Sequence, residues 1–315
     1  MSPAESAQQA GISFIKAVLR GISQVILIEN ALTGLAALIG IFSASYGLGI
    51  VAALSSIIGT AVGRCCGAER KVVDQGLFGY NAVLTGIAIA LFLDGPGKWI
   101  VAPAAAFLSA IFAASMMNWL GRIQLPVFTF PFIVLTWVIL LAAYRMDFIA
   151  LNPVLNPQNV SDIHQSLTDI PDILQGVVHG VGQVFIMDDF IAGLIILSGV
   201  FLAGIRPGIS AVLGSAAAWL TAYLLGAESS WIDQGLYGYN AVLTMLALSW
   251  TFPSERGRRF SYLAGLAAAA SSVPVTSGIS VFLAPYGLPA FTMPFTLTAW
   301  ISLSARQWFQ KAGSS

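Results

Sequence analysis

The chain has very few charged residues. Only 9% of its 315 residues are Asp, Glu, Lys or Arg, whereas an ordinary soluble domain has about 25%. The 14 acidic and 14 basic residues give a net charge of zero, so no general attraction to nucleic acid is expected. Hydrophobic residues make up 57% of the sequence, which is more than one water-soluble core can hide. The composition predicts an integral membrane protein whose remaining apolar surface is covered by lipid.

Residues that carry out chemistry are also scarce. The two cysteines, Cys65 and Cys66, are neighbours and form neither a disulfide framework nor a metal-ligand spacing. His164 and His179 do not recur at matching positions, so we interpret them as surface or structural residues. The sequence contains no His-Glu-x-x-His, Gly-x-Ser-x-Gly or Cys-x-x-Cys motif. An enzyme is therefore the least favoured class, and no cofactor is expected.

A long internal repeat is the strongest positive signal. The stretch Asp74–Thr85 recurs as Asp233–Thr244 with eleven of twelve positions identical, at an offset of 159 residues. Late in each half, Leu125–Phe132 matches Leu288–Phe295 at an offset of 163. Two related halves in a very apolar chain predict a membrane protein built by duplication, in which the solute path commonly lies where the halves meet.

Each half reads as one short apolar segment followed by five longer ones, and we expect all of them to be helical. The short segments fall below the roughly 20 residues that span a bilayer, so we interpret them as re-entrant half-helices. The chain then divides into a first repeat half (1–143), a polar extracytoplasmic linker (144–173) and a second repeat half (174–315). The segments are 12–27, 31–45, 47–63, 76–93, 99–119 and 125–143, then 174–187, 190–204, 207–225, 235–251, 260–283 and 288–305.

The distribution of basic residues tests this count of crossings. If only the five longer segments cross, one side of the membrane receives twelve basic residues and the other receives only Lys98 and Arg145. This strong positive-inside bias predicts that both termini are cytoplasmic. Because five is an odd number, the second half enters from the opposite face, and the repeat is inverted. The twelve are Lys16, Arg20, Arg64, Arg70, Lys71, Arg122, Arg206, Arg256, Arg258, Arg259, Arg306 and Lys311.

Two prolines recur five residues apart in Leu125–Phe132 and Leu288–Phe295. Proline removes a backbone donor and obstructs a helix, and a carbonyl freed at membrane depth must be satisfied by protein or line a wet cavity. Thr129 and Thr292 stand between the prolines. One interpretation is a kinked helix whose threonine bonds back to its own backbone. We favour the other, in which both hydroxyls and the nearby carbonyls face a pore, because two inverted copies share one path.

The repeated block also places a Tyr-Asn pair at the start of a helix in each half. Asparagine is a good helix cap, and we assign Asn81 and Asn240 that structural role. The tyrosines stand near the entrance of each segment, with a leucine one turn deeper at i+4. They either line a narrow path or simply pack, and the sequence leaves both interpretations open. These residues are Tyr80, Leu84, Tyr239 and Leu243.

Each short segment ends near a glutamine that is followed by acidic residues. If these segments are re-entrant, their last carbonyls and the side chains of Gln24 and Gln183 reach the midplane. Glu29, Asp188 and Asp189 come just before a helix start, where an acid caps free N–H groups. We favour capping, although a carboxylate inside a membrane is also a candidate ion site. The alternative function is therefore an ion- or proton-coupled secondary transporter of a small polar solute.

The paired Leu-Pro-x-Phe-Thr-x-Pro-Phe blocks, the paired Gln-Gly-Leu-x-Gly-Tyr-Asn blocks and the duplicated five-crossing layout together resemble the urea transporter family. The resemblance covers nearly the whole chain. It implies a passive, channel-like path for urea or another small neutral amide, subunits that assemble as homotrimers, and no metal. We expect a bacterial member of the family in the inner (plasma) membrane.

The same resemblance implies which residues form the path. Thr129 and Thr292 would line its middle, and Gln24 and Gln183, with neighbouring carbonyls, would belong to two facing rows of oxygens. The family often has phenylalanine at the two tyrosine positions and an aromatic residue where Leu27 stands. A slot with an aliphatic wall is expected to select less strictly for flat solutes. The slot walls implied are Val25, Leu27, Tyr80, Leu84, Val184, Ile186, Tyr239 and Leu243.

Overall fold

The computed structural model describes residues 3–163 and 170–313, and His164 lies outside this range. The protein is almost entirely helical, as the sequence predicts. The first half contains α1 (Pro3–Ser23), the 3₁₀ turn η1 (Gln24–Ile26), α2 (Ala31–Ala44), α3 (Tyr46–Cys65), α4 (Arg70–Asp74), α5 (Gly79–Phe92), α6 (Lys98–Gly121) and α7 (Phe130–Ala143). The second contains α8 (Ile173–Gly182), the 3₁₀ turn η3 (Gln183–Phe185), α9 (Phe190–Ala203), α10 (Ile205–Leu224), α11 (Ser229–Asp233), α12 (Gly238–Leu246), α13 (Arg258–Leu283) and α14 (Met293–Gly313).

Shorter elements connect these helices. Strand β1 (Leu93–Asp94), between α5 and α6, pairs antiparallel with β2 (Ala150–Leu151) of the linker, and η2 (Val160–Asp162) follows β2. A π-helical turn (Ala247–Thr251) continues α12, and η5 (Ala284–Tyr286) follows α13. The sequence interpretation missed the short helices α4 and α11, the π-helical turn and the strand pair.

Every predicted apolar segment corresponds to a helix or a broken helix. Within the described residues, α3, α6, α10 and α13 are each long and apolar enough to cross a membrane. The short segments bend sharply into the helices that follow them, by 73° between α1 and α2 and by 78° between α8 and α9. Bends of this size agree with the predicted re-entrant half-helices. Helices α5 and α7 are shorter, at 14 residues each.

The two halves repeat the same unusual backbone conformations. Leu27 and Ile186 both take a left-handed conformation, with φ of 60° and 61°, where the two 3₁₀ turns end. Phe128 and Phe291 do the same, with φ of 48° and 49°, inside the proline blocks. This region is rare for residues other than glycine. Its recurrence at repeat-equivalent positions shows that the halves share a backbone path.

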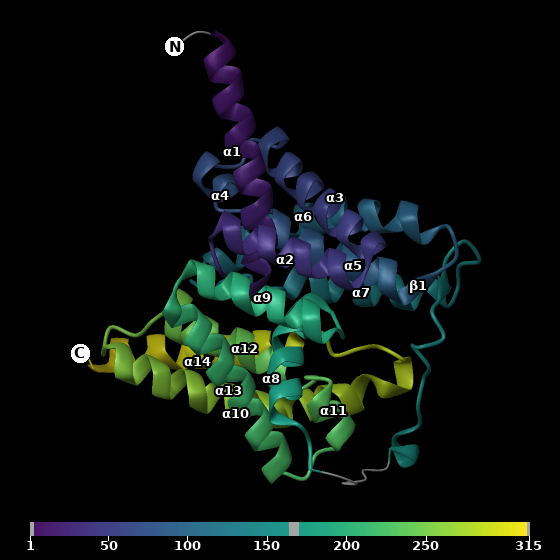
Figure 1. Ribbon diagram of the computed structural model, residues 1–315, viewed down its shortest axis with the longest axis vertical. Helices are drawn as coiled ribbons and strands as arrows, with labels where there is room; N and C mark the ends of the chain where they lie inside the picture. Colours follow the sequence, from purple (N-terminus) through teal and green to yellow (C-terminus); the bar gives the residue numbers. More distant parts are fainter. Residues whose placement is uncertain (1–2, 164–169, 314–315) are drawn as a thin grey trace.

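Contacts between the halves are reciprocal. The indole of Trp137 donates to the carbonyl oxygen of Pro289 at 2.9 Å, and that of Trp300 donates to the carbonyl oxygen of Pro126 at 2.8 Å. In the second bond each residue is replaced by its repeat equivalent in the other half. A pair of contacts related in this way indicates a two-fold axis between the halves. In Figure 1, α1 descends from the top and α8 rises from the bottom, and η1 and η3 contact each other between them. The halves are therefore inverted repeats.

Helices α2 and α9 form the main seam between the halves. The hydroxyl of Thr33 on α2 donates to the carbonyl oxygen of Gly199 on α9 at 2.7 Å. The adjoining surface is made of small residues, because a Cβ on Gly199 would lie 2.6 Å from the methyl of Ala36. Small residues with an interhelical hydrogen bond are the usual means of close helix packing in a membrane.

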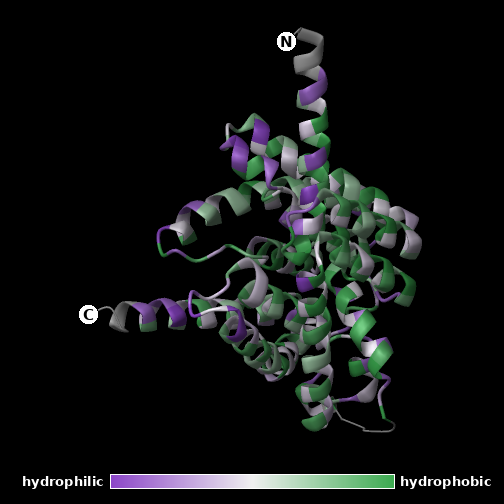
Figure 2. Cartoon of the chain, turned by 60° about the vertical axis from the view of Figure 1, so that its left-hand side comes forward, coloured by the Kyte–Doolittle hydropathy of each residue, from purple (hydrophilic) through white to green (hydrophobic). Residues whose placement is uncertain are grey.

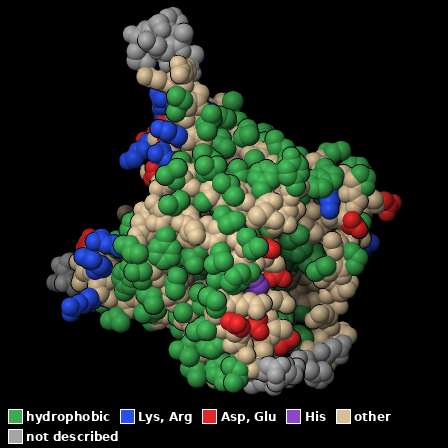
Figure 3. All heavy atoms as spheres, viewed as in Figure 1, with side chains coloured by type: hydrophobic (Ala, Val, Ile, Leu, Met, Phe, Trp, Pro, Cys, Tyr) green, Lys and Arg blue, Asp and Glu red, His purple; other side chains and the backbone are tan. Residues whose placement is uncertain are grey.

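Polar and apolar side chains are separated on the surface. Figure 2 shows hydrophobic residues along the bodies of the helices and hydrophilic residues at their ends. In Figure 3 the basic side chains gather along the left edge, beside the base of α1 and near the end of α14. Acidic side chains gather on the right and on the lower part of the same view. The basic edge is the face that the charge distribution of the sequence predicts to be cytoplasmic.

One close backbone approach in each half requires glycine. Gly76 and Gly235 have positive φ, 82° and 69°, and a Cβ on either would collide with the backbone of Gly21 or Gly180. We expect Gly235→Ala to lower the stability of the folded protein by more than about 1 kcal/mol. The measurement is the midpoint of thermal unfolding of the protein in detergent.

The matched control for this prediction is Gly278→Ala in α13, where a Cβ would meet nothing within 4 Å. That variant is expected to unfold at or slightly above the wild-type midpoint, since alanine favours a helix over glycine. Equal midpoints for the two variants would contradict the requirement for glycine at position 235.

Candidate functional site

Two cavities of similar size lie at repeat-equivalent positions, and each has a volume of about 260 Å³. We call them the first mouth and the second mouth. The first mouth is lined by Gln24, Leu27, Leu77, Tyr80, Met117, Leu125, Pro126, Val127, Phe128, Thr251 and Phe252. The second mouth is lined by Val154, Leu155, Asn156, Gln158, Trp231, Leu236, Tyr239, Thr276, Ser280, Ala284, Gly287, Leu288, Pro289 and Ala290. The repeat offsets relate Leu77, Tyr80 and Pro126 to Leu236, Tyr239 and Pro289. The proline blocks and the repeated Tyr-Asn blocks therefore form corresponding walls.

The two mouths open at opposite ends of the helices. Phe252 of the first mouth comes shortly before α13, and Ser280 of the second lies close to the end of that helix. Twenty-six helical residues extend about 39 Å, more than the hydrocarbon thickness of a bilayer. Helix α14 runs the other way, from next to the second mouth to Arg306, which donates to the carbonyl oxygen of Phe252 at 2.7 Å. The two mouths therefore lie near opposite ends of a helix that is long enough to span a bilayer.

Thr129 and Thr292 meet midway between the mouths. Their hydroxyl oxygens lie 2.7 Å apart, and both residues are buried. The hydroxyl of Thr296 lies 3.4 Å from that of Thr129 and donates to the carbonyl oxygen of Thr292 at 3.0 Å. The two hydroxyls thus contact each other across the halves, whereas the alternative interpretation had each threonine bonding back to its own helix backbone.

Tyr80 and Tyr239 support the broken backbone of the proline blocks. The hydroxyl of Tyr80 donates to the carbonyl oxygen of Phe128 at 2.7 Å, and that of Tyr239 donates to the carbonyl oxygen of Phe291 at the same distance. Both carbonyls belong to the left-handed residues just before the threonines. Each tyrosine thus lines a mouth, and its hydroxyl fixes the position of a phenylalanine carbonyl oxygen next to the paired threonines.

Asn81 and Asn240 cap helices, but not the helices predicted. Asn81 lies inside α5, and its amide oxygen accepts from the backbone N–H of Phe132 in the first turn of α7 at 3.1 Å. Its amide nitrogen donates to the carbonyl oxygen of Phe128 at 3.1 Å. Asn240 repeats both contacts with Phe295 and Phe291, at 3.0 and 3.3 Å. Asparagine does cap a helix, but it caps a different one: α5 and α12 begin three residues before the positions that capping by Asn81 and Asn240 requires.

The two glutamines end the re-entrant helices. The amide nitrogen of Gln24 donates to the carbonyl oxygen of Gln75 at 3.0 Å, and the residue lines the first mouth. Gln183 stands at the equivalent place in the second half and is half-buried. Leu27 also lines the first mouth, and its carbonyl oxygen accepts from the hydroxyl of Thr251 at 3.4 Å.

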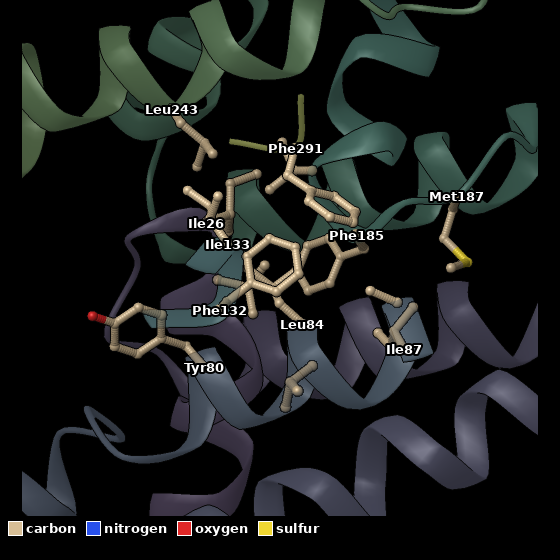
Figure 4. Packing of buried hydrophobic residues seen from close by; sticks show 14 of the residues in the cluster. Ile26, Tyr80, Leu84, Ile87, Phe132, Ile133, Phe185, Met187, Leu243 and Phe291 are labelled. Atoms are coloured by element: carbon tan, nitrogen blue, oxygen red, sulfur yellow. The ribbon is translucent and has the colours of Figure 1, made fainter. Parts of the chain in front are cut away.

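The remaining predicted slot residues lie in the main hydrophobic cluster of the protein. Figure 4 shows the rings of Phe132, Phe185 and Phe291 close together between Leu84 of the first half and Leu243 of the second. Phe132 and Phe291 have ring centroids 4.9 Å apart. The cluster, with residues packed against it, includes Val25, Leu27, Tyr80, Leu84, Val184, Ile186, Tyr239 and Leu243.

The acidic residues stand away from both mouths. Asp189 caps α9, accepting from the backbone N–H of Ala192 at 2.7 Å, as predicted. Glu29 and Asp188 precede the capping residue by one position and instead pair with Arg20 and His179, at 3.8 and 3.7 Å. Their side chains are 42% and 58% exposed, and neither residue lines a mouth. Glu29 and Asp188 are therefore surface ion-pair partners in this structure, not helix caps.

Several residues of the site escaped the sequence interpretation. Phe252 lines the first mouth and packs edge-on against Phe128, with centroids 5.9 Å apart, and Phe92 packs in the same way against Phe291 at 5.7 Å. The linker contributes Leu155 and Asn156 to the second mouth. The recurrence of Trp137 and Trp300 at the offset of 163 was a signal for the reciprocal indole bonds. No comparable signal marked Phe252 or the linker.

Comparison with known proteins agrees with this architecture. The family profile described as "Urea transporter" matches residues 15–307, which is almost the whole chain. "Urea transporter 1" of Ovis aries is 28% identical over 306 residues, covering 93% of this chain and 77% of that protein. "Urea transporter 1" of Rattus norvegicus is 26% identical over 297 residues with the same coverage. The chain belongs to the urea transporter family.

Proposed function

We propose that urea crosses the membrane passively along the line from the first mouth, past Thr129 and Thr292, to the second mouth. As a urea transporter the protein moves a solute and is not an enzyme. The main support for this route is that the hydroxyl oxygens of Thr129 and Thr292 lie 2.7 Å apart, between two equivalent cavities. Membership of the predicted slot walls in the main hydrophobic cluster is consistent with this route.

The chemistry of the route suits a small neutral amide. Urea carries four N–H donors and one carbonyl oxygen, and losing its water without replacement costs several kcal/mol. A threonine hydroxyl offers one donor and two lone pairs, so the bond between Thr129 and Thr292 leaves groups that a passing urea can use. The carbonyl oxygens of Phe128 and Phe291 lie next in the chain, but each already accepts from a tyrosine hydroxyl and an asparagine amide, so the threonine hydroxyls are the groups left for urea. Flat apolar walls complete a slot for a planar solute.

The same walls oppose ions. Among the described residues, neither mouth has a charged side chain in its lining. An ion that loses its hydration in such a path has no opposite charge to compensate it, and the Born cost is large. The acids required by the coupled-transport alternative are either a helix cap or exposed ion-pair partners. This placement supports passive transport over coupled transport.

We also propose the orientation and the assembly. The basic edge faces the cytoplasm, so both termini are cytoplasmic and the second mouth opens on the outer side of a bacterial inner membrane. Three subunits assemble, each with its own path. Cross-linking of the purified protein followed by native mass spectrometry measures the assembly, and a monomer or dimer would refute it.

The test of passive transport is stopped-flow light scattering of proteoliposomes in a urea gradient. Flux is expected to follow the urea gradient alone and to be indifferent to membrane potential, to a proton gradient and to sodium. A requirement for any of these gradients would overturn the proposal in favour of coupling. A panel of acetamide, formamide and water then measures how strictly the slot selects.

Thr129→Val combined with Thr292→Val is expected to slow urea flux by about tenfold or more. Each hydroxyl replaced by a methyl leaves passing polar groups unpaired, at a cost of about 1–3 kcal/mol per lost bond. The control is Thr33→Val, which removes a buried threonine hydrogen bond at the seam between α2 and α9 and lines neither mouth. Wild-type flux in the double variant would show that the two threonines lie outside the route.

The triple variant Glu29→Gln, Asp188→Asn and Asp189→Asn is expected to keep urea flux within about twofold of wild type. Asparagine preserves the cap at position 189, and exposed ion pairs contribute only about 0–1 kcal/mol to stability. The measurement is the same proteoliposome assay, with thermal unfolding to confirm folding. Loss of flux by a normally folded triple variant would instead favour the ion-coupled alternative.

A further inference from the structure

A third cavity, of about 200 Å³, lies between α13 and α14 at the basic edge and is separate from both mouths. Its lining combines two arginines and three serines with aromatic and small apolar side chains. The two arginines are Arg256, in the loop before α13, and Arg306, near the end of α14. The other lining residues are Leu248, Ser254, Phe260, Ser261, Ala264, Ser302, Ala305, Phe309 and Gln310.

We propose that this cavity binds the phosphate group of an anionic membrane phospholipid. Basic pockets between membrane helices on the cytoplasmic side are suited to anionic lipid head groups. Arginine is also the side chain best matched to phosphate oxygens, because its planar fork donates two parallel hydrogen bonds. The inference depends on the orientation proposed above only for the choice of leaflet, and it does not depend on the urea route.

The cavity opens where lipid head groups lie. Phe260 and Phe309 line it and remain 42% and 59% exposed, and Trp308 beside them is 65% exposed. Large exposed aromatic residues next to arginines are typical of the membrane–water interface. In Figure 3 basic side chains and hydrophobic side chains lie together near the end of α14. A phospholipid has the matching shape, with an anionic group at one end and apolar chains at the other.

The charges in the cavity are arranged to face an anion. Arg306 is half-buried and uses one guanidinium nitrogen to donate to the carbonyl oxygen of Phe252 at 2.7 Å. Arg256 is exposed, and its guanidinium lies 5.5 Å from the ring centroid of Phe260. Glu255, next to Ser254 in the same loop, attracts Arg306 electrostatically, but it is exposed and is absent from the lining. The lining therefore carries two positive charges and no negative charge.

The two halves differ at this end of the bundle. At the offset of 163, Ser302 and Arg306 correspond to Ile139 and Ala143 in the first half. Ala143 is buried there in the main hydrophobic cluster, and strand β2 contacts α7. One half closes this end of the bundle with apolar packing, while the other keeps an arginine-lined cavity. Arg306 gives one guanidinium nitrogen to the carbonyl oxygen of Phe252, and we assign its further donors and those of Arg256 to the ligand.

Native mass spectrometry of the protein in detergent, titrated with phosphatidylglycerol or with phosphatidylcholine, tests the site. Wild type is expected to retain phosphatidylglycerol in preference to phosphatidylcholine. Arg256→Gln should weaken phosphatidylglycerol binding about fivefold, because each basic residue near the head groups contributes about 1 kcal/mol. Ala264→Leu, which fills the cavity without changing charge, should weaken it as well.

The matched control is Arg259→Gln, which removes one charge from the same edge but not from the cavity lining. It should leave retention within about twofold of wild type. An equal loss in Arg256→Gln and Arg259→Gln would show only general surface attraction and would overturn the proposal. Displacement of the lipid by millimolar inorganic phosphate would also overturn it, since the site would then take a free anion. Thermal unfolding of each variant confirms that a loss of binding is not a loss of fold.

Discussion

The structure depends on satisfying backbone carbonyls where helices break inside a membrane. Each proline block forms a non-helical connection just before α7 or α14, with a left-handed phenylalanine, Phe128 or Phe291, whose carbonyl oxygen needs a partner from the protein because the bilayer core holds no water. Those two oxygens receive hydrogen bonds from a tyrosine hydroxyl and an asparagine amide of a neighbouring helix. The proline carbonyls earlier in the blocks receive an indole N–H from the opposite half. The broken backbone can therefore stay polar at the centre of an apolar protein, which is what a path for urea needs.

The repeat architecture could be predicted from the sequence because duplication makes each motif occur twice. The near-identity of Asp74–Thr85 and Asp233–Thr244 gave the repeat, and the charge distribution gave the odd number of crossings. The two threonines could be paired because inverted copies of one block must face each other across an axis. Contacts between residues far apart in the sequence could not be predicted in this way. Asn81 caps α7 and not α5, and that contact joins residues 51 positions apart.

The halves have diverged most where the two sides of the membrane differ. Arg20 and His179 occupy equivalent positions, and both bond to the carbonyl oxygen of the equivalent aspartate, Asp74 or Asp233, at 2.9 Å. Both also pair with an acid, Glu29 or Asp188. The hydrogen bond to the aspartate carbonyl is thus kept in both halves. The permanently charged arginine of the first half is replaced by an imidazole in the second, on the side with fewer basic residues. The sequence comparison missed this equivalence because the two residue types differ, although their offset is the 159 of the surrounding block.

The two mouths also differ in the residues that line them. The first mouth is lined by Thr251, the last residue of the π-helical turn, and by Phe252, which follows it. The hydroxyl of Thr251 donates to the carbonyl oxygen of Leu27 in the same mouth. The position equivalent to Thr251 in the first half is Phe92, which packs against Phe291 with no hydroxyl to offer. The second mouth gains the linker residues Leu155 and Asn156 instead. On the proposed route a solute would meet different polar partners at its two entrances and the same paired threonines in the middle. Because a passive path must balance weak binding along its whole length, we expect the centre, which is alike in both halves, to set what can pass and the unequal entrances to set how readily it is admitted from each side.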